Sequence, residues 1–370
     1  MKTRVVKVRS SNQAASAAKA ARAVAAGKLV GFATETVYGI AALATDDEAM
    51  ARLRELKSRP GRPFSVHVGR PEDVGRYVAS VPTPARRLIG KAWPGPITLL
   101  LPTGGRLADR KLQRSGLYDR LCSDGVIGLR CPDLPVARKM LAGVDGPVVA
   151  PSANLAGEQS PRSAADVLAQ LDGQIDMLLD SGPTRYGTDS TIVRFSGDDW
   201  RIVRRGVYDR QEIRKRTCWT IMFVCTGNTC RSAMAAGIAG KLLAERFGCR
   251  VRDLPSRGID VISAGLFAGP GAAASPEAIR AARNHGVDIS RHRAQNITIE
   301  LINSADLIFC MEELHRSRLC DIAGDAAARI RLLDPRKPIG DPVCGGIEIY
   351  AQTADRIEKL VRKHLDREAP

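Results

Sequence analysis

The sequence predicts two α/β domains in one chain, the second of them a small doubly wound parallel sheet. The chain has 370 residues, which is too long for one typical core and about right for two. Short apolar runs alternate with helical stretches on both sides of a polar, charge-rich segment at residues 208–218. We therefore expect one domain at residues 1–210 and another at 219–370, joined by a short helix and linker within 211–218.

In the first domain, residues 28–34 and 64–69 are apolar and short, which predicts strands. Residues 12–26 and 47–57 carry the spacing of amphipathic helices. Residues 189–205 contain two β-rich runs, DSTIVRF and WRIVRR, separated by a turn signal. These two runs predict a strand pair that closes the domain.

The second domain alternates strand and helix patterns. Strands are expected at 219–224, 260–264 and 306–311, and helices at 231–247 and 347–365. A further helix is opened by Ser275 as N-cap and Pro276 in the first turn. Strands separated by helices in this way favour a doubly wound parallel sheet.

Composition indicates a soluble protein. Hydrophobic residues make up 44% of the chain and aromatic residues only 4%, and the apolar runs are far shorter than the roughly 20 residues needed to cross a membrane. The first 13 residues are basic but contain no apolar segment or cleavage site of a secretion signal. We expect a cytoplasmic location and no membrane partner.

Cysteine spacing and charge limit the kinds of site and ligand that the chain is expected to have. The nine cysteines show no C-x-x-C pair, which argues against a disulfide framework and against a zinc site. Residues 1–216 hold 35 Lys and Arg against 22 Asp and Glu, while the remainder is nearly balanced. A basic first half suits nucleotide or RNA phosphates, and a solvated arginine-rich surface explains it equally well.

Residues 225–232, CTGNTCRS, lie between a predicted strand and a predicted helix. A nucleophilic cysteine reacts as its thiolate, which a helix N-terminus and a nearby cation stabilise. Cys225 and Arg231 satisfy both conditions, and the guanidinium of Arg231 suits two phosphate oxygens. Inward-pointing N–H groups of such a loop bind oxyanions. Gly227 and Asn228 are residue types that tolerate positive φ in a tight turn.

Transfer of a phosphoryl group to sulfur also needs an acid that protonates the leaving group. A candidate stands far downstream, in the segment GDPVCGGIEIY at residues 340–350. Pro342 and two glycines are expected to fix a loop that carries Asp341.

These residues together resemble the low-molecular-weight protein tyrosine phosphatase family over residues 220–365. The resemblance includes ISAG from residue 262 and ADLIFCM from residue 305. It implies that Cys225 is the nucleophile, Arg231 the phosphate clamp and Asp341 the general acid, with no cofactor. It also implies a phosphate-binding loop made of Thr226, Gly227, Asn228, Thr229, Cys230 and the thiolate-stabilising Ser232.

Within that family the loop and the tail from Asp341 most resemble protein arginine phosphatases. There a threonine, here Thr229, replaces a bulkier aliphatic residue. Its hydroxyl and smaller bulk suit a guanidinium leaving group, which favours phosphoarginine over phosphotyrosine in the phosphorylated protein substrate. Ala233 departs from the usual proline and is expected to soften the exit of the loop more than its chemistry.

Other interpretations of this half remain open. A lone cysteine is most often a packed core residue, and the domain then binds phosphoproteins without turnover. Cys230 either forms a reversible disulfide with Cys225 or merely packs. Cys310 and Cys320 suggest an arsenate reductase as an alternative function, since the thiols of such an enzyme act in relay. Packing also explains Cys310, which lies at the end of a predicted strand.

The first half contains no Walker loop and no G-x-G-x-x-G motif, so nucleotide binding there needs another device. Short hydroxyl and amide side chains at strand ends, with Lys57 and Arg59 nearby, suit a triphosphate and a small zwitterion. Each cluster alone is weak, since Ser-Ala-Asn is more often a turn. The clusters are ATETVYG (33–39), LKSRP (56–60), SVHV (65–68), APSAN (150–154) and GTDSTIV (187–193).

In this order the clusters resemble the threonylcarbamoyl-adenylate synthase family over nearly all of residues 4–210, including WPGPITLLL (93–101) and IVRRG (202–206). The resemblance implies an open, concave α/β fold around a twisted sheet. It implies that ATP, bicarbonate and L-threonine give threonylcarbamoyl-AMP and pyrophosphate. The carbamoyl group then passes to an adenosine of tRNA with the help of partner proteins.

The resemblance also assigns site residues. The expected ATP contacts are Lys57, Arg59, Ser152, Asn154, Ser160 and Arg204. The expected threonine contacts are Thr34, His67, Arg130 and Ser190, with the arginine pairing the carboxylate. Mg²⁺ is expected to bridge the phosphates, although no carboxylate cluster identifies its seat.

Two departures and two alternatives accompany this assignment. Arg62 stands, in a segment one residue shorter, where relatives commonly have Asn-Pro, and Arg205 replaces a proline. His67 lies in an apolar strand, so a satisfied core histidine is the simpler explanation of its position alone. A first half that has lost synthesis and binds RNA is a further possibility, against which the complete K-x-R and S-x-N motifs argue. The leading hypothesis is a synthase fused to a cysteine phosphatase.

Overall fold

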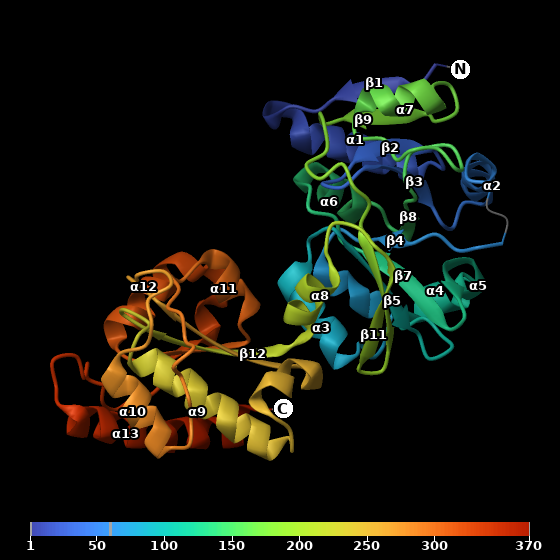
Figure 1. Ribbon diagram of the computed structural model, residues 1–370. Helices are drawn as coiled ribbons and strands as arrows, with labels where there is room; N and C mark the ends of the chain where they lie inside the picture. The colour runs from blue at the N-terminus through green and yellow to red at the C-terminus, as the bar shows by residue number, and fades with distance from the viewer. Residues whose placement is uncertain (1, 59–60, 370) are drawn as a thin grey trace. The chain divides into compact units, whose positions relative to one another are not determined.

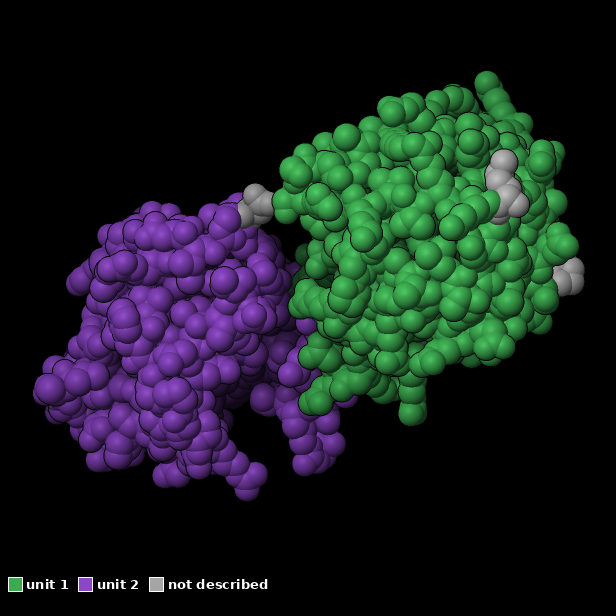
Figure 2. Space-filling model, turned by 90° about the horizontal axis from the view of Figure 1, so that it is seen from above, with its two compact units in different colours: residues 1–213 green, residues 214–370 purple. Residues whose placement is uncertain are grey.

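The computed structural model describes residues 2–58 and 61–369, and these form two compact units, 1–213 and 214–370 (Figure 1, Figure 2). The division falls inside helix α8 (Arg210–Thr217), which occupies most of the segment expected to hold a short helix and linker. Arg59, one of the predicted ATP contacts, lies outside the described residues. Each unit is described by itself.

Unit 1 is built on a mixed sheet that contains eleven strands within the described residues. The strand order is β1-β9-β2-β3-β8-β4-β7-β5-β10-β11, with β6 paired to β7. The strands are β1 (Arg4–Lys7), β2 (Val30–Ala33), β3 (Tyr38–Leu43), β4 (Val66–His67), β5 (Ile97–Pro102), β6 (Cys122–Ser123), β7 (Val126–Arg130), β8 (Val148–Val149), β9 (Met177–Asp180), β10 (Thr191–Ser196) and β11 (Asp199–Arg204). The predicted closing pair is confirmed, because β10 and β11 are antiparallel neighbours.

Helices cover both faces of this sheet because neighbouring side chains of a strand point to opposite faces. Val30 and Phe32 of β2 pack with α1 and α6, whereas Leu29 and Ala33 belong to the core under α2, α3 and α7. The helices are α1 (Gln13–Ala25), α2 (Asp47–Leu56), α3 (Thr83–Ala92), α4 (Arg110–Arg114), α5 (Tyr118–Leu121), α6 (Pro135–Ala142) and α7 (Ala164–Leu171). Asp46 caps α2, accepting a hydrogen bond from Ala49 N–H at 2.8 Å.

Unit 2 is a parallel sheet of four strands among the described residues, in the order β13-β12-β14-β15. Ile221 and Phe223 of β12 face the core formed with α9, α10 and α13, while Met222 and Val224 face α11 and α12. The sheet is therefore covered on both faces, as Figure 1 also shows, and the predicted doubly wound fold is confirmed. The elements are β12 (Trp219–Cys225), α9 (Arg231–Arg246), β13 (Ile259–Gly265), α10 (Pro276–Asn284), α11 (Ile299–Ser304), β14 (Leu307–Cys310), α12 (Glu313–Ala323), β15 (Ile330–Leu332) and α13 (Ile347–Glu368).

The structure confirms the predicted start of α10 and adds elements of unit 2 that were not predicted. The N-cap of α10 is Ser275, as expected, and its Oγ accepts a hydrogen bond from Ala278 N–H at 3.2 Å. The elements α11, α12 and β15 were not predicted, because α11 and β15 are brief and the apolar residues of α12 follow only a weak helical pattern. No helix in the described part of the chain combines the length and the apolar character needed to span a membrane.

Candidate active sites

Unit 1 holds a cavity of about 520 Å³ on its sheet. Its walls come from the end of α2 and from strands β4, β5, β7, β10 and β11, so segments far apart in sequence meet there. Of the described residues predicted to bind ATP or threonine, six line it: Lys57, His67, Arg130, Ser152, Ser190 and Arg204. The other three, Thr34, Asn154 and Ser160, hydrogen-bond to residues in the wall.

Lys57 joins the two predicted ATP motifs. Its Nζ donates to the carbonyl oxygens of Ser152 at 3.1 Å and Asn154 at 2.8 Å, and to Asn154 Oδ1 at 2.9 Å. Ser152 Oγ donates to the same Oδ1 at 2.5 Å. The cation at the end of α2 is thereby fixed over the loop that follows β8, and a phosphate placed there meets a lysine and a hydroxyl together.

A second cluster lies at the start of β10. Arg204 Nη2 donates to the carbonyl oxygen of Ser190 at 2.8 Å and to its Oγ at 3.0 Å, and Ser190 Oγ lies 2.9 Å from Thr98 Oγ1. Asp189 lies 3.6 Å from Arg204 Nη1 and accepts a hydrogen bond from Ser160 Oγ at 3.2 Å. Burial lowers the pKa of Arg204, and the charge of Asp189 opposes that shift.

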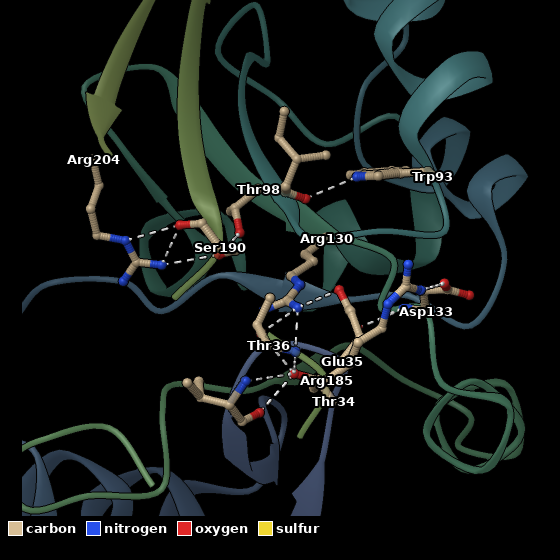
Figure 3. A network of polar contacts seen from close by, with 12 residues as sticks. Thr34, Glu35, Thr36, Trp93, Thr98, Arg130, Asp133, Arg185, Ser190 and Arg204 are labelled. Carbon is tan, nitrogen blue, oxygen red and sulfur yellow. Dashed lines mark hydrogen bonds and ion pairs between the residues drawn. The ribbon is translucent and has the colours of Figure 1, made fainter. Parts of the chain in front are cut away.

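The third cluster centres on Arg130, which lies at the end of β7 and is only 5% exposed. Its Nη2 forms an ion pair with Glu35 Oε1 at 2.7 Å and donates to Thr36 Oγ1 at 2.7 Å and, more weakly, to Thr34 Oγ1 at 3.4 Å (Figure 3). Thr34 Oγ1 in turn donates to the carbonyl oxygen of Val37 at 2.7 Å. The hydroxyl proton of Thr34 is therefore used inside the protein.

His67 is both buried and part of the cavity wall, so the two interpretations of its position are compatible. Its side chain faces Phe32 edge-on, and Nδ1 lies 3.4 Å from the carbonyl oxygen of Ser65. Burial, followed by the charge of Arg130, lowers the pKa of His67 from 6.5 to about 3. The imidazole is accordingly neutral at physiological pH.

Four polar residues of this region were not singled out from the sequence: Glu35, Thr36, Thr98 and Asp189. Three of them lie within clusters already identified, Glu35 and Thr36 in ATETVYG and Asp189 in GTDSTIV. Their signal was the density of polar residues at strand ends. Their partners are not neighbours in sequence, so their roles became visible only in the folded chain.

The thiol loop of unit 2 runs from β12 to the first residue of α9, as predicted. Cys225 Sγ lies 3.0 Å from Ser232 Oγ and accepts the backbone N–H of Asn228 at 3.2 Å. Asn228 takes positive φ, at 56°, whereas Gly227 does not, because the turn is made at Asn228. Gly265 of β13 faces the loop, and a Cβ there lies 2.6 Å from the carbonyl oxygen of Thr226, which only glycine avoids.

Asn228 holds the loop from inside. Its Nδ2 donates to Ser232 Oγ and Ser263 Oγ, both at 2.9 Å, and its Oδ1 accepts Gln295 N–H at 3.0 Å. Its carbonyl oxygen lies 2.6 Å from His292 Nε2. Every polar group of this buried side chain is thus engaged, so the loop is preorganised for an anion.

Arg231 is 1% exposed, and two carboxylates meet its guanidinium. Nη2 lies 2.6 Å from Asp341 Oδ2, and Nη1 lies 3.1 Å from Glu312 Oε2. Nη1 also donates to the carbonyl oxygen of Ile339 at 2.9 Å, while Nε has no partner among the described residues. The predicted clamp and the predicted acid therefore lie together, although 110 positions separate them.

Glu312 and His315 were missed by the sequence analysis. Both belong to the start of α12, directly after β14, where Glu312 is the N-cap and His315 Nδ1 accepts its backbone N–H at 3.1 Å. His315 Nε2 lies 2.9 Å from Thr226 Oγ1. Burial, followed by the charge of Arg231, lowers the pKa of His315, so the ring is neutral and donates through Nε2.

The cysteines in the described part of unit 2 are all free thiols. Cys225 and Cys230 are both free thiols, and Cys230 Sγ contacts Ser275 Oγ at 3.3 Å and Tyr350 Oη at 3.4 Å. Cys310 is fully buried in β14, and this burial raises its pKa far above the ordinary range. Such a thiol is a poor nucleophile, which disfavours the arsenate reductase alternative.

Residues 22–206 match the family Sua5/YciO/YrdC, described as telomere recombination. The chain is 35% identical over 192 residues to threonylcarbamoyl-AMP synthase of Pyrococcus abyssi, a match that covers 51% of this chain and 53% of the relative. The chain thus spans about half the length of that relative. A solved structure of a variant of Sua5 from P. abyssi aligns with a TM-score of 0.50 and 25% identity, covering 71% of this chain and 91% of the other.

Residues 220–369 match the low molecular weight phosphotyrosine protein phosphatase family. The chain is 36% identical over 148 residues to the protein-arginine-phosphatase of Bacillus subtilis, which covers 39% of this chain and 92% of the relative. The two matches do not overlap, and each lies wholly within one unit.

Proposed function

Because the chain belongs to the Sua5/YciO/YrdC family over its first half and to the low-molecular-weight phosphotyrosine protein phosphatase family over its second, we propose that it is a bifunctional enzyme. Unit 1 makes threonylcarbamoyl-AMP and pyrophosphate from ATP, bicarbonate and L-threonine. Unit 2 hydrolyses phosphorylated side chains of proteins. The observation that supports the first activity is the meeting of Lys57, Ser152, Arg130 and Arg204 around one cavity.

The synthase reaction has two steps. The amino nitrogen of threonine attacks the carbon of bicarbonate, water leaves, and a carbamate forms. A carbamate oxygen then attacks the α-phosphorus of ATP while the bond to the pyrophosphate oxygen breaks. Such a reaction depends mainly on alignment and on cations that offset the charge developing on pyrophosphate, so a cavity lined by Lys57, Arg130 and Arg204 suits it without a dedicated base.

Lys57, Arg59, Ser152, Asn154, Ser160 and Arg204 are our candidates for the ATP contacts. We expect Mg²⁺ to arrive with ATP. No group of three or more metal-ligating side chains is present in residues 2–58 and 61–369, and Mg²⁺ commonly binds through substrate phosphates, water and one or two carboxylates. Asp189 is the candidate carboxylate because it lies in the cavity wall beside Arg204.

Threonine is assigned to the cluster of Thr34, His67, Arg130 and Ser190. Arg130 lines the cavity with a guanidinium that suits a carboxylate. His67 is neutral, so its unprotonated nitrogen accepts a hydrogen bond from an ammonium or a hydroxyl. A zwitterion with a β-hydroxyl complements this combination.

In unit 2, we assign Cys225 as the nucleophile. An S–P bond forms as the bond from phosphorus to the leaving group breaks, and Asp341 gives its proton to the departing nitrogen or oxygen. Water, deprotonated by Asp341, then attacks phosphorus and releases phosphate and the thiolate. The thiolate is supported by Ser232 Oγ and Asn228 N–H, and Arg231 with the loop N–H groups holds the phosphoryl oxygens.

We favour phosphoarginine as the substrate. Thr229 is half-buried and its Oγ1 lies 3.6 Å from Cys230 Sγ. The second half of the chain is 36% identical over 148 residues to a protein-arginine-phosphatase. Phosphotyrosine is the alternative, which the family description favours.

One assay tests the synthase. The purified chain is incubated with ATP, bicarbonate and labelled L-threonine in the presence of Mg²⁺, and pyrophosphate is measured. We expect release that depends on all three substrates. Pyrophosphate release from ATP alone, or none from a folded chain, contradicts the synthase and leaves unit 1 as an RNA-binding module.

We place both activities in the cytoplasm, with tRNA and its modifying proteins as the consumers of threonylcarbamoyl-AMP. Threonylcarbamoyl-AMP is a mixed anhydride and hydrolyses readily, so a nearby acceptor is required. Transfer of label from threonine to tRNA in a cell extract, lost when the chain is withdrawn, tests this partner assignment.

A further inference from the structure

The side-chain hydroxyl of Thr226 is a polar group of the thiol loop that the mechanism of unit 2 does not use. Thr226 directly follows Cys225 and is partly exposed, whereas its polar neighbours His315 and Arg231 are 0% and 1% exposed. Thr226 Oγ1 lies 2.9 Å from His315 Nε2 and 3.5 Å from Arg231 Nη2. The hydroxyl thus stands beside the phosphate clamp, and its role is inferred on the basis of the proposed phosphatase function.

Hydrogen bonds to His315 fix the direction of its contact with Thr226. His315 Nδ1 accepts the backbone N–H of Glu312 at 3.1 Å, so Nδ1 carries no proton. The proton of the neutral ring is then on Nε2, which donates to Thr226 Oγ1. Because burial and the charge of Arg231 lower the pKa of His315, the neutral ring persists at physiological pH. The oxygen of Thr226 is therefore the acceptor in this contact.

The hydrogen of the Thr226 hydroxyl is left for a ligand. A hydroxyl has one hydrogen to donate and two lone pairs. One lone pair accepts from His315 Nε2, and the other accepts weakly from Arg231 Nη2. No acceptor for the hydrogen lies within hydrogen-bond distance in residues 2–58 and 61–369. The acceptor is thus either solvent or a molecule that binds in the loop.

The contacts of Arg231 indicate where such a molecule binds. A guanidinium offers parallel N–H groups along its Nε–Nη2 edge and its Nη1–Nη2 edge. Nη1 is held by Glu312 Oε2 and the carbonyl oxygen of Ile339, whereas Nε is buried without a partner in the described part of the chain. We therefore expect a phosphoryl group on the Nε–Nη2 edge, where it replaces Asp341 Oδ2 on Nη2. A phosphoryl oxygen on Nη2 lies on the same nitrogen as Thr226 Oγ1.

We propose that the hydroxyl of Thr226 donates a hydrogen bond to a phosphoryl oxygen of the substrate, and that His315 is a positioning residue which directs this hydroxyl. His315 does not touch the substrate. It occupies one lone pair of Thr226, so the hydroxyl hydrogen points away from the ring. The hydrogen bond is made to the phosphoryl group itself, so inorganic phosphate, the product, reports on it as well as the substrate does.

The experiment measures binding of inorganic phosphate to the full chain by calorimetry, in wild type, Thr226→Val and Thr226→Ser. In Thr226→Val we expect the Kd for phosphate to rise about tenfold, as for a lost hydrogen bond to a charged group. The kcat/KM for a phosphoarginine peptide is expected to fall in parallel. Thr226→Ser keeps the hydroxyl, and we expect its Kd to rise no more than about twofold. An unchanged Kd in Thr226→Val, or an equal loss in both variants, overturns the proposal.

Thr220→Val is the matched control. Thr220 lies at the opposite end of β12, and its buried Oγ1 has no hydrogen-bond partner within the described residues. Its replacement therefore removes a buried hydroxyl of the same strand without removing a contact, and we expect the Kd for phosphate to stay unchanged. A tenfold rise in Thr220→Val as well overturns the proposal, because the effect is then a general response of the strand.

A double-mutant cycle tests the positioning role of His315. His315→Leu removes the donor to Thr226, and we expect the Kd for phosphate to rise about threefold in the wild-type background but to stay nearly constant in Thr226→Val. Equal effects in both backgrounds show that His315 does not act through Thr226. His315→Asn, whose shorter side chain does not reach Thr226, takes its place if His315→Leu does not fold.

Failure of the phosphatase function is a separate result. A wild-type chain that binds phosphate but releases none from phosphoarginine or phosphotyrosine peptides lacks the proposed activity. A wild-type chain that releases phosphate, with Thr226→Val equally active, keeps the activity and removes only the role of the Thr226 hydroxyl.

Discussion

Each unit holds a buried arginine in its candidate site. The acid paired with one of them is buried, whereas the acids paired with the other are partly exposed. Arg130 and Arg231 are almost fully buried, and in both the Nε lacks a partner among the described residues. The acid on Arg130 is Glu35, whose side chain is 2% exposed. The acids on Arg231 are Asp341 and Glu312, whose side chains are 43% and 33% exposed.

The difference in exposure indicates that the acid on Arg130 stays in place, whereas an acid on Arg231 is able to move away. Removing one partner of a buried pair leaves an unpaired charge at a cost of about 3–5 kcal/mol, so Glu35 is part of the scaffold. A half-exposed aspartate gives up little when it turns toward solvent. We therefore expect Asp341 to leave Arg231 when a phosphate enters the loop and then to act as the acid.

The largest test of this comparison separates the two units by chemistry. Cys225→Ala removes the proposed nucleophile, and we expect phosphatase turnover to fall at least about a thousandfold because no S–P bond can form. Pyrophosphate release by unit 1 is expected to stay within about twofold. Both activities are measured on the same preparation of the full chain.

Cys249→Ser is the control for that experiment, because Cys249 is a half-buried thiol of the same unit outside the loop. We expect it to retain both activities. Substantial phosphate release by Cys225→Ala shows that another residue is the nucleophile. A parallel loss of pyrophosphate release shows that the two sites are not independent.

A smaller effect tests the releasable acid. Asp341→Asn cannot protonate the leaving group, and we expect kcat to fall about a hundredfold. The asparagine is not an anion, so it competes less with phosphate for Arg231, and inhibition by inorganic phosphate is expected to be as strong as in wild type or stronger. Asp355→Asn, at an exposed carboxylate on α13, is the control. Weaker inhibition by phosphate in Asp341→Asn contradicts the hypothesis that the carboxylate of Asp341 competes with phosphate for Arg231.

The burial of His67 in the wall of the synthase cavity predicts a pH effect on stability. Because burial and Arg130 lower the pKa of His67 to about 3, the folded chain does not take up a proton there between pH 6.5 and 3, whereas the unfolded chain does. The stability due to neutral His67 is thus fully present above pH 6.5 and is lost as the pH falls. At pH 5 we expect a loss of about 2 kcal/mol in the free energy of unfolding relative to pH 7.

Urea unfolding of the full chain at pH 7 and pH 5, followed by tryptophan fluorescence, measures this loss. His67→Gln removes the titrating group and is expected to reduce the pH dependence by the same amount. His315, whose pKa is also lowered, contributes to both proteins and cancels in the difference. An identical pH dependence in wild type and His67→Gln shows that His67 is protonated in the folded chain.

The two sites also differ in how many of their residues could be predicted from the sequence. The site of unit 2 is mostly one continuous loop, so the strand, the turn at Asn228 and the helix that begins at Arg231 were readable from local residue types. Asp341 was found because Asp-Pro with two glycines marks a fixed loop. Glu312 was missed because only the packing of β14 beside β12 brings it to Arg231.

The site of unit 1 is spread over strands that are neighbours only in the sheet. Clusters of polar residues were visible in the sequence, but which of them meet depends on the strand order, which no local pattern gives. Glu35 lies inside a cluster that the sequence analysis quoted, yet its burial depends on Arg130, 95 positions away. Partners of buried charges are therefore the part of a site that a single sequence conceals.

The smallest expected effect concerns substrate choice in unit 2, which the geometry of the loop leaves to one side chain. Thr229→Ile adds bulk and removes a hydroxyl beside the phosphate, and we expect the ratio of kcat/KM for phosphoarginine over phosphotyrosine to fall about tenfold. Thr229→Val removes the hydroxyl at nearly constant shape, and Thr229→Ser keeps it with less bulk, so the pair assigns the effect to polarity or to size. Phosphate release from matched phosphoarginine and phosphotyrosine peptides gives the ratio. A ratio that stays constant across all three variants shows that specificity is determined outside the loop, for example by the partly exposed side chains of Asp341 and Glu312.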